Sequence, residues 1–388
     1  MLRVYLDNNA STPVLPEVLA AMQPYFAESF GNPSSIHQNG QAARAAIEDA
    51  RESVARLIGA RGSEIVFTSG GTEADNLAVA GIAAPGDHII TSSIEHHAVL
   101  HACRYAASQG CEVTEVPVNG TGVVDPADVR RAIRRNTRLI SVMFANNETG
   151  VLQPVDEIGK IAAGSGIHFH TDAVQGAGKI ALDVTKIGCS LMSLSGHKMH
   201  APQGVGALFV RKGTQVRASL QGGPQERFRR AGTENVPGIV GLGRAASASR
   251  LALSEPNGGM VEILRNRLEQ GILNRVDGCT VNSGPAPRTP NTASIRFDCI
   301  DGEAMVIALD LQGVAASSGA ACSSGATKPS HVLTAMGLTP AQARSTIRFS
   351  LGRQTTEADI DFALDAVIVT VARLRALSPR YSAEMVRS

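Results

Sequence analysis

Tryptophan is absent from the 388-residue chain, and aromatic residues make up only 4% of it. Charged residues are also scarce, at 18% against the ~25% usual for soluble proteins. The formal net charge of +1 gives no general reason to expect nucleic acid or a membrane as a partner. No uninterrupted apolar run is long enough to span a bilayer, and residues 1–11 lack the features of a signal peptide. We therefore expect a cytoplasmic protein that contacts neither nucleic acid nor a membrane.

The sequence also lacks closely spaced pairs of cysteines. The six cysteines are spread along the chain with no CxxC spacing, which argues against a zinc ribbon or a dithiol redox site. A chain of this kind is expected to keep them as reduced thiols. Cys322 differs from the rest, because small and polar residues surround it in the segment 317–325. The other five lie in apolar segments, which is typical of packed, unreactive thiols: Cys103, Cys111, Cys189, Cys279 and Cys299.

Glycine, by contrast, is abundant, with 39 residues, and suits an α/β core with several close backbone approaches. From about residue 35 the sequence alternates helical and strand-like segments. Strands that alternate with helices predict a mostly parallel sheet, here of seven strands, with helices on both faces. The expected strands are 64–68, 88–91, 112–116, 139–145, 167–171, 191–193 and 206–210.

The last third of the chain has a different pattern, which predicts a smaller α+β unit. Helical periodicity covers 234–253, 259–275, 303–311 and 356–377, and strand-like segments cover 293–297, 314–317 and 346–350. The segment Glu-Pro-Asn-Gly-Gly at 255–259 interrupts the pattern. We expect a large α/β domain over residues 13–255 and a small α+β domain formed by residues 1–12 and 256–388.

Polar residues at strand ends are the candidates for chemistry, because open α/β sheets bind ligands there. The sequence Ser-Gly-Gly-Thr-Glu at 69–73 follows a strand and opens a helix. Its glycines permit close approach, and the unbonded amides of a helix start favour a phosphate. Taken alone, this motif is equally compatible with an ordinary strand–helix turn.

Asp172 and Lys198 also stand at strand ends. A carboxylate such as Asp172 can keep a pyridinium nitrogen protonated, and a lysine such as Lys198 can form a Schiff base with a carbonyl cofactor. Ser195 and His197 precede this lysine and are able to bind phosphate. A phosphate turn, an aspartate and a lysine together are far more specific than any one of them.

Metal binding is an alternative interpretation of the same region. His168, His170 and Asp172 alternate along one strand and so face one side, as in a two-histidine–carboxylate site. His97 and His101 lie four residues apart on an expected helix, but no carboxylate or cysteine at matching spacing completes that set. We favour Asp172 as the functional residue of its strand, with the two histidines packed or hydrogen-bonded.

With these residues assembled, the chain resembles the cysteine desulfurases of the nitrogen-fixation and housekeeping iron–sulfur type over nearly its whole length. The motifs that carry the resemblance occur in family order at 5–10, 31–35, 71–72, 95–96, 146–150, 172–175, 195–198, 230–235, 317–324 and 348–350. The resemblance implies the pyridoxal-phosphate (PLP) dependent transferase fold of the aspartate-aminotransferase type (fold type I). It also implies PLP as cofactor, L-cysteine as substrate and a homodimer.

The resemblance further implies roles for individual residues. Lys198 would hold PLP covalently, Asp172 would pair with the ring nitrogen, and His96 would stack on the ring and help proton transfer. Arg348 would hold the substrate carboxylate, with Asn147 nearby. The remaining cofactor contacts would come from Gly71, Thr72, Asn147, Gln175, Ser195 and His197, and from Thr233 of a second subunit.

Cys322 would be the nucleophile, on a loop whose glycines and small side chains make mobility plausible. It would take sulfur from cysteine as a persulfide, leave alanine, and pass the sulfur to an iron–sulfur scaffold or another acceptor protein. With a scaffold partner it would ligate an iron–sulfur cluster transiently; no other metal is expected.

Three alternatives stay open. Another enzyme of the same fold, an aminotransferase or a selenocysteine lyase, is the nearest, although transamination does not need a thiol such as Cys322. A metal-dependent enzyme using His168, His170 and Asp172 is the second. A non-catalytic sulfur carrier or scaffold is the third, but it would not need Lys198 and His96 together with Asp172.

Overall fold

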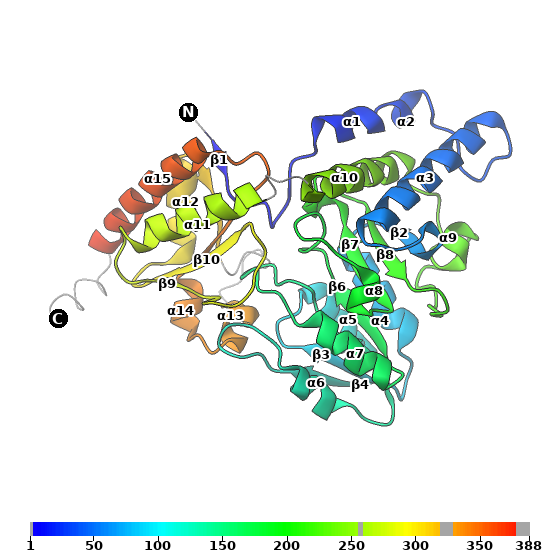
Figure 1. Cartoon of the computed structure of the whole chain (residues 1–388), viewed down its shortest axis with the longest axis horizontal. Coiled ribbons are helices and arrows are strands. Elements are labelled where there is room, and N and C mark those ends of the chain that lie inside the picture. The colour runs from blue at the N-terminus through cyan, green and yellow to red at the C-terminus, as the bar shows by residue number, and fades with distance from the viewer. Residues whose placement is uncertain (1–2, 255–258, 319–328, 378–388) are drawn as a thin grey trace.

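The structure is a computed structural model that describes residues 3–254, 259–318 and 329–377. A large sheet with its covering helices forms one part, and a smaller sheet with α11, α12 and α15 forms the other (Figure 1). None of the helices in the described ranges is both long enough and apolar enough to cross a membrane.

The large sheet has seven strands. β3 to β7 run parallel, whereas β8 lies antiparallel between β2 and β7. The prediction of a mostly parallel sheet of seven strands is therefore confirmed. In spatial order the strands are β2 (Ile65–Thr68), β8 (Gly206–Val210), β7 (Leu191–Ser195), β6 (His168–Asp172), β5 (Thr137–Ser141), β3 (His88–Ser92) and β4 (Glu112–Val116).

Both faces of this sheet are covered by helices, so most of its strands are buried along nearly their whole length and carry apolar residues on both faces. Successive strand residues point to opposite faces, so Ile90 belongs to the buried cluster that includes residues of α3 and α10, while Ile89 belongs to the cluster that includes residues of α4 and α5. The first face is covered by α1 (Pro16–Met22), α3 (Gln38–Leu57), α6 (Pro126–Ala132), α7 (Val155–Gly164), α8 (Val184–Ile187) and α10 (Val236–Ser254), and the second by α4 (Gly71–Ile82) and α5 (His97–Ser108).

The smaller sheet is antiparallel, and α11 (Met260–Leu273), α12 (Gly302–Leu311) and α15 (Glu357–Ala376) pack around its core. Thr356 caps α15 by accepting a hydrogen bond from the Asp359 amide, while the Asp359 side chain accepts from the Thr356 amide. Its strands, in spatial order, are β12 (Ser317–Ser318), β13 (Thr346–Ser350), β10 (Thr292–Phe297) and β9 (Cys279–Val281).

The N-terminal segment connects the two parts. β1 (Val4–Tyr5) pairs in parallel with β11 (Val314–Ala315), and the Asn9 amide donates to Ser350 Oγ at 2.9 Å. The Thr12 amide then donates to the His197 carbonyl at 2.8 Å, next to the large sheet. The remaining elements are α2 (Pro24–Ala27), α9 (Gln225–Phe228), α13 (His331–Ala335), α14 (Pro340–Arg344) and the 3-10 turns η1 (Gly62–Glu64) and η2 (Gly196–Lys198). The domain limits at residues 12 and 255 stay a prediction.

Two strand predictions were wrong in extent. The apolar segment 139–145 is strand only to Ser141, because beyond it the chain leaves the regular pairing while staying buried. The Phe144 amide still donates to the Asp172 carbonyl at 2.8 Å, and Ala145 bridges to Leu152. The segment 314–317 is divided between β11 and β12, which belong to different sheets.

Candidate active site

A cavity of about 350 Å³ lies at the edge of the large sheet where β6 and β7 end. It occupies the position where an open α/β sheet is expected to bind ligands. Residues distant in sequence line it together, and ten of them were predicted as site residues: Gly71, Thr72, His96, Asn147, Asp172, Gln175, Ser195, His197, Lys198 and Arg348.

One end of the cavity is formed by the start of α4. Gly71 is the first residue of this helix, and a side-chain Cβ at its position would lie 2.8 Å from Val174 Cγ2 and 3.4 Å from Ser195 Cβ. A Cβ atom only 2.8 Å from Val174 Cγ2 would clash with it, so glycine is the residue that fits at position 71. The unpaired amides of the helix start, with the Thr72 and Ser195 hydroxyls beside them, are well suited to hold a phosphate.

Asp172, at the end of β6, supplies a buried negative charge to the cavity. Its Oδ1 accepts a hydrogen bond from the Val174 amide at 2.9 Å. Burial raises the pKa of this carboxyl, although the nearby Lys198 acts in the opposite direction. Asp75, one turn into α4, lines the same cavity, and burial together with the Asp172 charge raises its pKa as well. A carboxylate in this position favours a cationic ligand group beside it.

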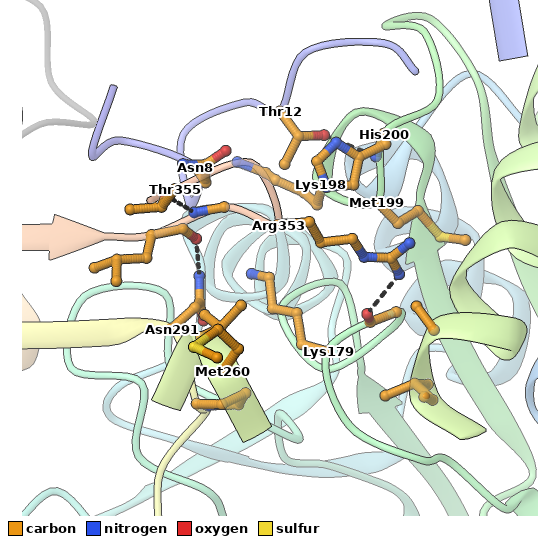
Figure 2. Close-up of a pocket in the computed structure, with 17 residues that line it drawn as sticks. Asn8, Thr12, Lys179, Lys198, Met199, His200, Met260, Asn291, Arg353 and Thr355 are labelled. Carbon is orange, nitrogen blue, oxygen red and sulfur yellow. Dashed lines mark hydrogen bonds between the residues drawn. The ribbon is translucent and has the colours of Figure 1, made fainter. Parts of the chain in front are cut away.

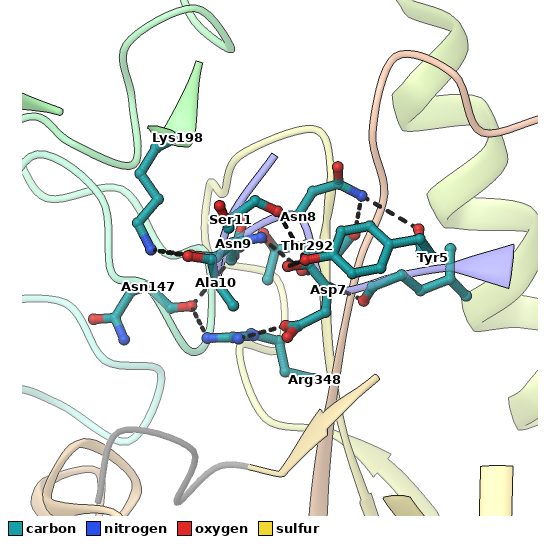
Figure 3. A network of polar contacts seen from close by, with 12 residues as sticks. Tyr5, Asp7, Asn8, Asn9, Ala10, Ser11, Asn147, Lys198, Thr292 and Arg348 are labelled. Atoms are coloured by element: carbon teal, nitrogen blue, oxygen red, sulfur yellow. Dashed lines mark hydrogen bonds and ion pairs between the residues drawn. The ribbon is translucent and has the colours of Figure 1, made fainter. Parts of the chain in front are cut away.

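Lys198 lies between two cavities. It lines the first one and also a second cavity of about 300 Å³ on its other side (Figure 2). Its Nζ donates to the carbonyl oxygens of Asn9 at 2.6 Å and Ala10 at 2.7 Å, so the N-terminal segment holds this amine (Figure 3). The 3-10 turn η2, which directly follows β7, carries Lys198 to this place.

His96 is the N-cap of α5, and its Nδ1 accepts a hydrogen bond from the Ala98 amide at 3.1 Å. Burial lowers the pKa of His96 to about 4, and the charge of Lys198 adds to this effect. At neutral pH the imidazole is therefore uncharged and is able to accept a proton.

Arg348 reaches the cavity from β13 of the smaller sheet. Figure 3 shows its Nη1 donating to the Asn147 carbonyl at 2.9 Å and its Nη2 paired with Asp7 Oδ1 at 2.7 Å. Within the described part of the chain its buried Nε has no hydrogen-bond partner. A guanidinium held in this way can still bind a carboxylate from the cavity side.

Comparisons with known proteins identify the family. Residues 4–362 match the model of the class-V aminotransferases. The chain is 50% identical over 380 residues to the cysteine desulfurase IscS of Methanosarcina thermophila, covering 97% of this chain and 94% of that one. It is 47% identical over 386 residues to the cysteine desulfurase NifS of Azotobacter vinelandii, covering 98% and 96%. The chain belongs to the class-V aminotransferases and, within them, to the cysteine desulfurases.

Solved structures of this family have the same fold. A NifS-like protein superposes with a TM-score of 0.89 at 37% identity, covering 96% of this chain and 100% of the other. SspA, solved in complex with cysteine, superposes with a TM-score of 0.80 at 38% identity, covering 90% and 98%. The predicted PLP-dependent transferase fold is therefore confirmed.

Enzymes of the cysteine desulfurase family use PLP, and the residues of the cavity fit this group. The close approach at Gly71 leaves the start of α4 open to a phosphate. The buried Asp172 carboxylate would be offset by a protonated ring nitrogen, and the Lys198 amine opens on the same cavity.

One predicted site residue that the structure describes does not line this cavity. Thr233 is exposed, follows α9 and is absent from the described residues that line the cavity. Its role toward a second subunit stays a prediction. Cys322 lies outside the described residues.

The histidines considered as metal ligands have other contacts. The ring nitrogens of His170 lie 2.8 Å from Ser141 Oγ and 2.9 Å from Ser193 Oγ, and burial lowers its pKa to about 3. His97 and His101 pack as a pair with ring centroids 5.4 Å apart. Across the ranges that the structure describes, no group of three or more His, Cys, Asp or Glu side chains could hold a metal ion.

Sequence reasoning missed several residues around the site. Asp75 is four residues after Gly71 in α4, so helical periodicity could have placed it on the same side. Lys179 lies only four residues after Gln175, to which it donates a hydrogen bond. Asn9 has no such local signal, because hydrogen bonds across the fold bring it to Lys198 and Gln175. Glu95 directly precedes His96 but is fully buried, and its Oε1 accepts a hydrogen bond from the Met143 amide at 2.9 Å.

Glu95 makes the stability of this desulfurase pH-dependent. Burial raises its pKa from 4.5 to about 8, so the folded protein holds this proton more tightly than the unfolded chain does. The resulting stabilisation is complete below about pH 4.5 and is lost as the pH rises to about 8. As the pH rises over this range, we expect the free energy of unfolding of Glu95→Gln to increase relative to that of wild type, by up to about 1.4 kcal/mol per pH unit.

Urea unfolding at about pH 5 and about pH 8 would measure this difference. The exposed Glu115, changed to Gln, is the matched control and should show no pH-dependent gain. A Glu95→Gln variant whose stability follows wild type at both pH values would contradict the prediction.

Proposed function

We propose that this protein removes sulfur from L-cysteine with PLP, producing L-alanine and a persulfide on Cys322. The observation that carries the proposal is the single cavity lined by Lys198, Asp172, His96 and Arg348. These side chains come from different elements of both sheets, and an unrelated function would not require them together. The cysteine bound in the related SspA structure supports L-cysteine as the substrate.

In this proposal Lys198 would hold PLP covalently, Asp172 would keep the ring nitrogen protonated, and Asn147 and Gln175 would contact the ring on its hydroxyl side. The phosphate is held at the start of α4 by Gly71, Thr72, Ser195 and His197. When bound, the cofactor supplies an electron sink for negative charge at the substrate Cα.

Arg348 binds the substrate carboxylate and so orients the amino acid in the cavity, with Asn147 beside it. His96, uncharged at neutral pH because its pKa lies near 4, and Lys198 carry protons to and from the substrate carbons.

Sulfur transfer follows from the chemistry of Cys322. Its thiolate attacks the substrate sulfur, forming a sulfur–sulfur bond as the substrate Cβ–S bond breaks. The electron pair of that bond stays with carbon, which takes up a proton and leaves as alanine. The product on the protein is a Cys322 persulfide. We propose that an iron–sulfur scaffold or another acceptor protein then takes this sulfur, and that the reaction takes place in the cytoplasm, where thiols stay reduced.

Three of the other cysteines are poor candidates for this step. Burial raises the pKa of Cys103 and Cys189 to about 12 and that of Cys279 to about 11, so these thiols stay protonated at neutral pH. A protonated thiol is a weak nucleophile.

We also propose a homodimer in which Thr233 reaches the phosphate of the partner's cofactor. Large apolar side chains that a second copy could cover are exposed on α2, on α9 and in the chain between α2 and α3. They are Phe26, Phe30, Ile36 and Phe228, with exposed fractions of 63%, 69%, 91% and 75%. Exposed apolar side chains of this size are typical of interaction surfaces.

Shared sites predict complementation between inactive subunits. A Lys198→Ala chain mixed with a low-activity Thr233→Arg chain should form heterodimers with one intact site, and so about half of the wild-type activity per heterodimer. Purified heterodimers carrying two different tags would be assayed against both parent homodimers. The shared site would be ruled out if the heterodimers were no more active than their parent homodimers. Full activity in a verified monomer would also rule it out.

The proposed function is tested by adding L-cysteine to purified protein and measuring alanine together with the sulfide released by a reductant. We expect the two products in equal amounts. An aminotransferase would give a keto acid without alanine, and a selenocysteine lyase would release little sulfide from cysteine. Either result would overturn the proposal.

A further inference from the structure

The segment 221–233, all of which the structure describes, contains a single buried residue. Glu226 lies in α9 with its side chain 3% exposed, whereas the rest of the segment is exposed or half-buried. Its two carboxylate oxygens accept hydrogen bonds from Arg51 of α3, at 2.6 Å and 2.8 Å. One of these oxygens also accepts from the Phe67 amide of β2 at 2.9 Å. One buried carboxylate therefore anchors a largely exposed segment to the large sheet and its helix.

The Arg51–Glu226 ion pair is almost completely buried, since the Arg51 side chain is only 5% exposed. Arg51 Nη1 also donates to the Ile65 carbonyl at 3.0 Å, which fixes the guanidinium against β2. Apolar residues of similar size often stabilise a core as well as a buried ion pair does, so stability alone does not require this pair. Two parallel hydrogen bonds fix direction as well as distance, so the pair determines where Glu226 lies.

Glu226 begins a turn with an unfavourable backbone conformation. The φ angles of Glu226, Arg227 and Phe228 are 47°, 58° and 62°, in the left-handed region that residues with a side chain rarely adopt. Phe228 is 75% exposed, so packing within its own chain does not compensate for this conformation. Glu226 holds the left-handed turn (226–228) at its start, and Arg227 Nη1 adds a hydrogen bond to the Ser63 carbonyl at 2.8 Å. Backbone strain that surrounding contacts maintain in this way is typical of functional positions.

The chain that leaves this turn contacts the start of α4 and then reaches Thr233. Arg230 Nε donates to Oε1 of Glu73, which lies in the first turn of α4, at 2.8 Å. Glu73 Oε2 in turn accepts a hydrogen bond from the Ser69 amide at 2.7 Å. Thr233 follows Arg230 by three residues and is exposed. The contacts of residues 226 and 230 therefore determine how the chain presents Thr233 at the surface.

We propose that Glu226 is a positioning residue for the cofactor site of the second subunit. Held by Arg51 and the Phe67 amide, it maintains the left-handed turn and so keeps Thr233 where it can contact the phosphate of the partner's cofactor. The inference rests on the proposed function, which places Thr233 in a shared site. Without this anchor the turn would relax, and ordering Thr233 again would oppose each binding event.

The experiment uses Glu226→Gln in heterodimers that carry two different tags. Both oxygens of Glu226 accept from N–H donors, so an amide NH₂ in place of either one would face a donor and break the anchor. One subunit carries Lys198→Ala, so the lysine-bound PLP adduct, followed by absorbance, forms only in the other. With Glu226→Gln placed in the Lys198→Ala subunit, we expect the Kd for PLP at the intact site to rise about tenfold, as for the loss of one hydrogen bond to a charged group.

The opposite placement is the internal control. Glu226→Gln in the subunit that keeps Lys198 should leave this Kd nearly unchanged, because Thr233 of that site comes from the other chain. Glu115, which is exposed on β4, provides the matched variant Glu115→Gln, which should have no effect in either subunit. Thr233→Ala in the Lys198→Ala subunit should raise the Kd by an amount similar to that of Glu226→Gln.

An equal rise in both placements of Glu226→Gln would show a general structural role and overturn the proposal, as would no rise in either. If that variant does not fold, judged by circular dichroism, Glu226→Asp gives the same comparison with a displaced carboxylate. Failure of both to fold would assign Glu226 to stability, which also overturns the proposal. If Thr233→Ala has no effect across the dimer, the shared site of the proposed function fails, and this inference with it. If Thr233→Ala acts and Glu226→Gln does not, only the role of Glu226 fails.

Discussion

Lys198→Ala should lower cysteine turnover by about a thousandfold or more, because it removes both the covalent attachment of the cofactor and a proton carrier. The purified wild-type protein should be yellow, and borohydride should trap its cofactor on Lys198. The variant should lose this trapped adduct, as measured by mass spectrometry of the reduced protein.

The fold itself should tolerate this change. The Lys198 amine donates to the backbone carbonyls of Asn9 and Ala10, and its side chain faces two cavities. Lys186→Ala, at an exposed position, controls for the loss of a lysine elsewhere. A colourless enzyme that is fully active, or a Lys198→Ala variant with normal turnover, would contradict the assignment of Lys198.

Cys322→Ser should separate cofactor chemistry from sulfur transfer. The variant is expected to bind PLP and to show a change in its absorbance spectrum when cysteine is added. It should release almost no alanine and carry no persulfide by mass spectrometry, because a hydroxyl is a far poorer nucleophile toward sulfur than a thiolate.

The control for this experiment is Cys279→Ser, which replaces a partly exposed cysteine whose thiol pKa is raised to about 11. It should keep normal activity and normal persulfide formation. Alkylating reagents should modify Cys322 before the other cysteines in the wild-type protein. Near-normal alanine formation by Cys322→Ser would move the chemistry elsewhere and favour another enzyme of the same fold.

Much of the fold could be predicted from local patterns. The strands of the large sheet are buried on both faces, so they appear in the sequence as short apolar segments between helical ones. The pattern does not predict where a strand ends when the irregular segment that follows it is also buried. Residues 142–145 are all apolar and buried, yet they leave the sheet and lead to Asn147 at the cavity.

Part of the chemistry of the site could also be predicted from the sequence. Asp172, Lys198 and His96 each stand at the end of a strand or the start of a helix, and parallel strands bring their ends to one edge. That geometric rule made Asp172 and Lys198 candidates for one site, and the structure brings His96 to the same cavity. The resemblance to a family added the roles of Arg348 and Thr233, which no local pattern indicates.

The sequence by itself determined the residue types of the site, the alternation of strands and helices, and the separate character of Cys322. Only the tertiary structure showed that Asn9 binds Lys198, that Lys179 binds Asn9 and Gln175, and that Glu95 and Asp75 are buried beside the site. The physical reason is the distance along the sequence over which each property is determined. A helix or strand depends on neighbours within a few residues, whereas a pKa or a shared acceptor depends on groups that meet only after the chain has folded, such as Lys198 and Asn9, which are separated by 189 positions.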